Sequence, residues 1–225
     1  MVHINSSSRC LAGVGIFFIC MALGCGIASQ LLNNWVEFWS TDNKDYAVPV
    51  KVTVQIGLWK TCGTVAALDG EETLTIKNCN SSTTLGSFLG LGTPLTEVKG
   101  MSLGSLSAGA LAGVFGIGAF GSFGVLIATG FLTLLQAGAM IGAVARFAWV
   151  VNDNDILQLI FNDPSINTSG TNGYSMGFFL SCASAGAAVL ACLFYFMGSC
   201  CACCSRDPES DEIQLVHVVT EKQNI

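Results

Sequence analysis

Long uncharged runs separate the chain into apolar segments and polar loops. No charged residue occurs from Cys10 to Leu32, and none occurs between Lys99 and Arg146. A helix needs roughly 20 apolar residues to cross about 30 Å of hydrocarbon. The first run therefore fits one membrane-spanning helix. The second is long enough for two, with a break in the glycine-rich segment 116–124.

A last uncharged run begins at Ser175 and ends near Gly198, so the pattern predicts four spans. The predicted segments are a cytoplasmic N-terminus 1–9, spans 10–32, 102–121, 125–149 and 175–198, loops 33–101 and 150–174, a cytoplasmic turn 122–124 and a cytoplasmic tail 199–225. The alternative for the first run is a cleaved signal peptide, since Gly26-Ile27-Ala28 resembles a small-residue cleavage site. That run is longer than the apolar core of a signal peptide, which usually has about 7–15 residues, and its length favours a retained span.

Composition supports lipid as the solvent of this chain. Of its 225 residues 52% are hydrophobic and 11% charged, whereas soluble domains carry about 25% charged residues. The net charge of −6 argues against nucleic-acid binding, which requires a basic face. Within the predicted spans the only ionised side chain is Arg146, near an end, which argues against a pump, a transporter or a pore. No cluster suited to acid–base chemistry is present, so we predict neither an enzyme nor a cofactor.

The first loop carries a β-strand pattern. Apolar and other residues alternate from Val50 to Leu58, and a shorter alternation covers 73–77. Asp69-Gly70 between them suits a hairpin turn. A two-residue turn would place Cys79 two residues along from the partner of Cys62, whereas a four-residue turn at 69–72 would place the two cysteines directly opposite. Either register favours a disulfide between neighbouring strands.

Small residues in the spans predict close helix packing, because apolar burial drives little association between helices in lipid. The candidate faces are Gly109/Gly113, Gly138/Gly142 and the group Ser181, Ser184, Gly186 and Ala187. Packing within one bundle is the simpler interpretation. A face for dimerisation is the alternative.

Glycosylation sequons and the loop cysteines indicate which side of the membrane each loop occupies. Asn80 and Asn167 begin glycosylation sequons, and four spans place both on the same side as Cys62 and Cys79, where an oxidising environment allows a bridge. We therefore expect loops 33–101 and 150–174 to be extracellular. The lysines of the first loop run against the positive-inside rule. A third sequon at Asn5 would be cytoplasmic and is expected to be unused.

Several of these residues resemble a family signature. Trp35, then Gly57-Leu58-Trp59, then Cys62 and Cys79, placed after a first span and before three more, resembles the W–GLW–C–C motif of the claudin superfamily. That superfamily also contains peripheral myelin proteins, epithelial membrane proteins and calcium-channel gamma subunits. The topology of the resemblance covers nearly the whole chain. It implies a left-handed four-helix bundle with an extracellular antiparallel β-sheet, built mostly from the first loop and completed by one strand beside the second.

Within the superfamily the chain is most similar to a divergent claudin. Phe161, Asn162, Asp163 and Pro164 resemble the aromatic–Asn–Pro turn with which claudins contact proteins of the apposed cell. The spacing between the two loop cysteines is longer than in typical claudins, and the Asn80 sequon is more typical of the other branches. The resemblance implies a plasma-membrane protein of cell–cell junctions that associates with itself or with related proteins. The alternative is a gamma-like auxiliary subunit of a channel or receptor.

The predicted tail begins with a cysteine cluster. Cys200, Cys201, Cys203 and Cys204 follow the last span and are candidates for palmitoylation. A metal site is the rival, but zinc spacing would need further ligands and the tail offers only His217. The apolar C-terminal Ile225 suggests a PDZ groove as a partner, although Gln223 is not the Ser or Thr that such grooves prefer.

Overall fold

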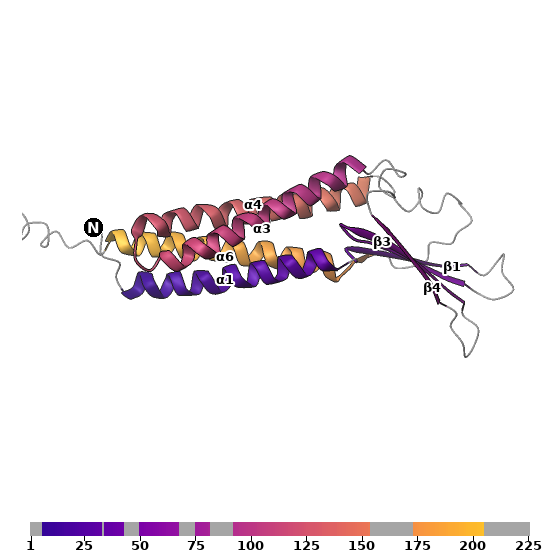
Figure 1. The fold of residues 1–225 in the computed structure, drawn as a ribbon, viewed down its shortest axis with the longest axis horizontal. Coiled ribbons are helices and arrows are strands. Elements are labelled where there is room, and N and C mark those ends of the chain that lie inside the picture. The colour runs from indigo at the N-terminus through magenta and orange to yellow at the C-terminus, as the bar shows by residue number, and fades with distance from the viewer. Residues whose placement is uncertain are drawn as a thin grey trace, which may run out of the picture.

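A computed structural model of the chain describes residues 6–32, 34–42, 50–67, 75–81, 92–153 and 173–204. Among these residues, four helices are long and apolar enough to cross a membrane, as the uncharged runs predict. They are α1 (Ser6–Leu31), α3 (Gly92–Gly118), α4 (Phe123–Asp153) and α6 (Met176–Cys204). The helices lie side by side in one elongated bundle, and a β-sheet stands at one end of it (Figure 1).

Several helix ends differ from the prediction, and α4 continues to Asp153, past the predicted end at residue 149. α3 begins at Gly92 rather than at residue 102, so the predicted loop residues 92–101 are helical. Pro94 is compatible with this start because the first turn of a helix needs no N–H donor there. α1 begins at Ser6 and α6 continues to Cys204. The turn between α3 and α4 covers 119–122, slightly before the predicted 122–124.

The sheet has the strand order β4-β3-β2-β1-β5, and all neighbours are antiparallel. Its strands are β1 (Val36–Asp42), β2 (Val50–Ile56), β3 (Lys60–Ala67), β4 (Thr75–Ser81) and β5 (Gly173–Tyr174). The alternating pattern correctly predicts β2, although the strand ends at Ile56 and not at Leu58. Of the strand predicted at 73–77, residues 75–77 belong to β4, which continues to Ser81, and residues 73 and 74 lie outside the described residues. β5 follows the second loop, in the position that the family resemblance implies.

Strand pairing decides between the two hairpin registers. Cys62 is paired directly with Cys79, as a four-residue turn at 69–72 requires, so the two-residue alternative is wrong. The turn itself lies outside the described residues. One row of the sheet reads Glu37, Gln55, Cys62 and Cys79 from β1 to β4. Because cross-strand neighbours share a face, the disulfide lies on the same face as Glu37 and Gln55.

Inside the bundle, hydroxyl groups and glycines join neighbouring helices. Ser184 of α6 donates to the carbonyl oxygen of Ala22 in α1 at 2.7 Å, and Ser105 of α3 donates to that of Gln136 in α4 at 2.8 Å. A Cβ atom on Gly109 would lie 2.5 Å from the Gln136 amide, so this glycine permits the close α3–α4 approach.

The predicted small-residue faces divide between the interior and the exterior. Gly109 and Gly113 pack against other helices, as do Ser181, Ser184 and Ala187. In contrast, Gly138 and Gly186 are exposed and have no atom within 4 Å of an added Cβ. Packing within the bundle therefore accounts for only part of the small-residue pattern.

Candidate functional site at the junction of sheet and bundle

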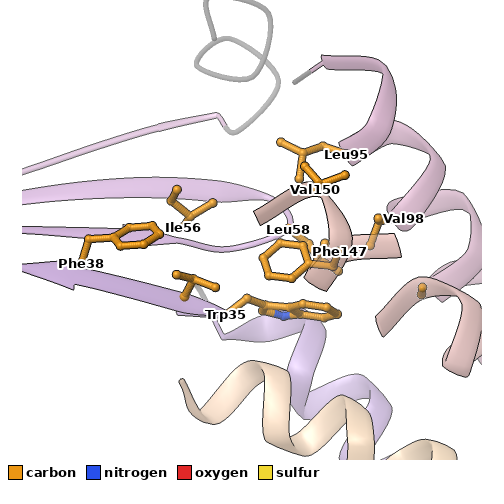
Figure 2. Packing of buried hydrophobic residues seen from close by; sticks show 10 residues of the cluster. Trp35, Phe38, Ile56, Leu58, Leu95, Val98, Phe147 and Val150 are labelled. Carbon is orange, nitrogen blue, oxygen red and sulfur yellow. The ribbon is translucent and has the colours of Figure 1, made fainter. Parts of the chain in front are cut away.

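Ten buried residues join the base of the sheet to the ends of the helices (Figure 2). We call this set the junction cluster. Its members are Trp35, Val36, Phe38, Ile56, Leu58, Leu95, Val98, Ala143, Phe147 and Val150. They come from β1, β2 and the segments beside them, and from α3 and α4, so the cluster is contiguous across the sheet and two helices. Burial of this apolar surface fixes the sheet to the bundle.

Trp35 lies at the centre of the junction. It follows α1 directly, and its position in sequence suggests an interfacial residue, yet it is fully buried. Its indole N–H donates to the carbonyl oxygen of Ser29 at 2.9 Å. The ring packs against Phe147 of α4, with centroids 4.9 Å apart, and against Phe178 of α6 at 6.4 Å. The side chain thus contacts three helices.

The backbone of Trp35 connects the same elements. Its N–H donates to the Ile56 carbonyl oxygen at the end of β2, and its carbonyl oxygen accepts from Ser175 before α6, both at 2.9 Å. Gly177 donates to the neighbouring Asn34 carbonyl oxygen at 3.1 Å. A Cβ on Gly177 would lie 2.6 Å from Trp35 Cδ1, so this position needs glycine.

The Gly57-Leu58-Trp59 segment is the turn between β2 and β3 and not the end of a strand. The Gly57 N–H donates to the Lys60 carbonyl oxygen at 3.0 Å and closes this turn. Leu58 is fully buried in the junction cluster, beside Phe147 in Figure 2. The turn therefore directs one apolar side chain into the ends of the helices.

Trp59, the last residue of this segment, contacts polar side chains of α1 and α3. It is 40% exposed, and its indole N–H donates to Gln30 Oε1 at 3.0 Å. The Gln30 amide donates in turn to Ser102 of α3. Lys99 Nζ lies 5.3 Å from the centroid of a Trp59 ring, within range of a cation–π interaction. These contacts join α1, the turn and α3.

The disulfide between Cys62 and Cys79 joins β3 to the edge strand β4, and Cys62 is 1% exposed. The bridge lies one residue in register from the Thr61–Asn80 pair. It cross-links the two strands that are farthest from the β5 edge. The predicted pairing of these cysteines is thus present in the structure.

An ion pair reinforces the helix ends nearest the sheet. Arg146 of α4 donates from Nε to Glu97 of α3 at 3.0 Å, and its guanidinium lies 4.4 Å from the centroid of a Trp149 ring. Both charged side chains are partly exposed, so solvent screens this pair. Arg146 is near the end of its span, as predicted.

The other predicted sites are described only in part. Asn80 belongs to β4, whereas Phe161, Asn162, Asp163, Pro164 and Asn167 lie outside the described residues. Cys200, Cys203 and Cys204 are exposed in the last turn of α6, and Cys201 is half-buried. This end of α6 lies at the opposite end of the bundle from the sheet (Figure 1). In the described part of the chain, no three His, Cys, Asp or Glu residues are placed to hold a metal ion.

Sequence reasoning missed three partners in the junction. Phe147 and Phe178 are far from Trp35 in sequence, and only the fold brings these rings together. Gln30, an amide at the end of an uncharged run, was a usable signal because such a group in lipid needs a hydrogen-bond partner.

Comparison with models of known protein families gave no match, and no curated protein matches this chain. The function is therefore inferred from the residues and from their contacts.

Proposed function

We propose that this chain is a claudin-like membrane protein of cell–cell junctions. In this proposal the sheet is extracellular, the bundle is left-handed, and the protein forms or regulates a paracellular barrier. Copies associate side by side in one membrane and with copies on the facing cell. Neither a catalytic step nor a cofactor is part of this role.

The observation that carries the proposal is the convergence of the motif residues. Trp35 and Leu58 are both fully buried where the sheet meets the helices, and Cys62 and Cys79 cross-link two strands of the same sheet. A sheet held in this way presents a rigid surface above the bilayer. Rigid surfaces suit repeated association, because little conformational entropy is lost on contact.

The arrangement of modification sites supports the proposed sidedness. The sheet contains the disulfide, which is favoured in the secretory lumen or at the cell exterior, and the Asn80 sequon, which could be glycosylated only there. The exposed cysteines of α6 lie at the other end, where cytoplasmic acylation takes place. The exposed glycines Gly138 and Gly186 offer room for close approach of a helix from a neighbouring protein.

Expression in cells that lack junctions tests the proposal. We expect the tagged protein to be enriched at borders between two expressing cells and absent from borders with non-expressing cells. Freeze-fracture imaging should then show strands. Replacing Phe161 and Pro164 together by alanine should abolish the enrichment without lowering surface delivery, whereas Ser165→Ala in the same loop should leave it unchanged.

A different result would favour the auxiliary-subunit alternative. Diffuse surface signal, together with altered gating of a co-expressed channel, would contradict the junction role. In that case the exposed glycines of α4 and α6 would be the first positions to test as contacts with the channel.

A further inference from the structure

Lys99 occupies an unusual place near the start of α3. Its side chain is buried, with 8% exposed, although it belongs to a candidate membrane span that begins at Leu95. Its nitrogen lies 5.3 Å from the centroid of a Trp59 ring. An ammonium in an apolar segment is costly unless an anion or water reaches it.

Among the described side chains, no carboxylate pairs with this lysine. Glu97, two residues earlier on the same helix, pairs instead with Arg146 of α4. Glu37 of β1 accepts a hydrogen bond from Gln55 at 3.5 Å. The interaction with the Trp59 ring is therefore the only electrostatic partner of Lys99 in the described part of the chain.

The ammonium nitrogen of Lys99 is not among the polar atoms that the structure seals without a partner. Among the described residues, those atoms belong to Ser8, Asn34, Gln136 and Tyr195. No described residue gives Lys99 Nζ a hydrogen bond or an ion pair, as expected for a tip that is open to the surroundings. A lysine inside a span can bury its aliphatic stem among apolar groups and extend its charged nitrogen to the headgroup layer.

We infer that Lys99 binds the phosphate of a phospholipid in the leaflet on the sheet side of the bundle. Lys99 lies about one helical turn inside the span that begins at Leu95, close enough for its long side chain to reach the headgroups. Trp59 is 40% exposed beside it, and indole rings favour this interfacial depth. The lipid phosphate supplies the anion that the described carboxylates do not.

Native mass spectrometry of the purified full-length protein tests this site. The probes are phosphatidylglycerol and digalactosyldiacylglycerol with identical acyl chains, since only the first contains phosphate. We expect the wild type to retain phosphatidylglycerol preferentially, and Lys99→Met to lower that retention about fivefold. Lys99→Arg should restore it. Lys60→Met, at an exposed lysine next to Trp59, should behave as the wild type.

Three results would overturn the inference. The first is equal retention of phosphatidylglycerol by Lys99→Met and the wild type. The second is displacement of the lipid from the wild type by excess inorganic phosphate, which would indicate a site for the free ion. The third is a carbodiimide cross-link from Lys99 to a carboxylate of the chain, which would indicate an internal ion pair. The last two use the wild type and decide the question even if the variant fails to fold.

Discussion

The rings of Trp35 and Phe147 meet at 69° with their centroids 4.9 Å apart. This edge-to-face contact is a favourable geometry for two aromatic rings, because the positive edge of one meets the negative face of the other. It also joins the segment between α1 and β1 to the last third of α4. The two helices are therefore connected at the exact level where the sheet begins.

Replacement of Trp35 tests the importance of this contact. Trp35→Ala should lower the free energy of unfolding by about 3–5 kcal/mol, because a large buried ring is lost and a cavity remains. Trp149→Ala is the control, since that indole is 57% exposed and its loss should cost about 1 kcal/mol or less. Reversible unfolding in mixed micelles measures both. Equal losses in the two variants would show that the junction does not determine stability.

Two glycines of α6 should respond oppositely to the same change. Gly177→Ala would bring a methyl group within 2.6 Å of Trp35 Cδ1, so we expect a loss of about 1–3 kcal/mol from overpacking. Gly186→Ala meets no atom within 4 Å and should instead gain up to about 1 kcal/mol from helix propensity. Thermal unfolding of the two purified variants compares them directly. A stabilised Gly177→Ala would contradict the packing described here.

Loss of the disulfide should weaken the sheet. Replacing Cys62 and Cys79 together by serine should cost about 3 kcal/mol, because the bridge restricts the unfolded chain. Cys182→Ser is the control, since this cysteine is free and exposed on α6. Protease resistance of the sheet and the yield of protein at the cell surface are the measurements. Unchanged protease resistance in the double variant would argue against a structural role of the bridge.

Replacing each of two buried glutamines by leucine should change the stability of the protein in opposite directions. Gln136 is sealed inside the bundle with both amide atoms unpartnered, so Gln136→Leu should stabilise the protein by about 1–2 kcal/mol. Gln30 accepts from Trp59 and donates to Ser102, so Gln30→Leu leaves these groups unpaired and should cost about 1–3 kcal/mol. Unfolding in the same detergent compares them. Destabilisation by Gln136→Leu would reveal a partner for that amide, such as a buried water.

The uncharged runs predict the helices well, because ionised groups are costly in lipid whatever the details of packing. The same logic places the start of α3 too late, since Glu97 and Lys99 lie within the helix. Arg146 and Trp59, both distant in sequence, provide their partners. Charge alone therefore predicts the number of helices better than it predicts their ends.

The sheet was predictable where its pattern is local. Alternation predicts β2, and the spacing of Cys62 and Cys79 around a four-residue turn predicts the observed pairing of β3 with β4. β1 was not predicted, since Trp39 and the polar residues after it interrupt the alternation. Burial of Trp35 was not predicted either, because a tryptophan after a span is equally suited to the membrane interface, and only Phe147 and Phe178 from other helices enclose it.

The hydrogen bonds from Trp35 to β2 and from Ser175 to Trp35 have a mechanical consequence. The segment that leaves α1 and the segment that enters α6 are hydrogen-bonded to each other at Trp35, so a tilt of the sheet would strain the ends of both helices. In the association of copies proposed above, the slope of the helices in the bilayer would therefore influence the angle at which two sheets meet.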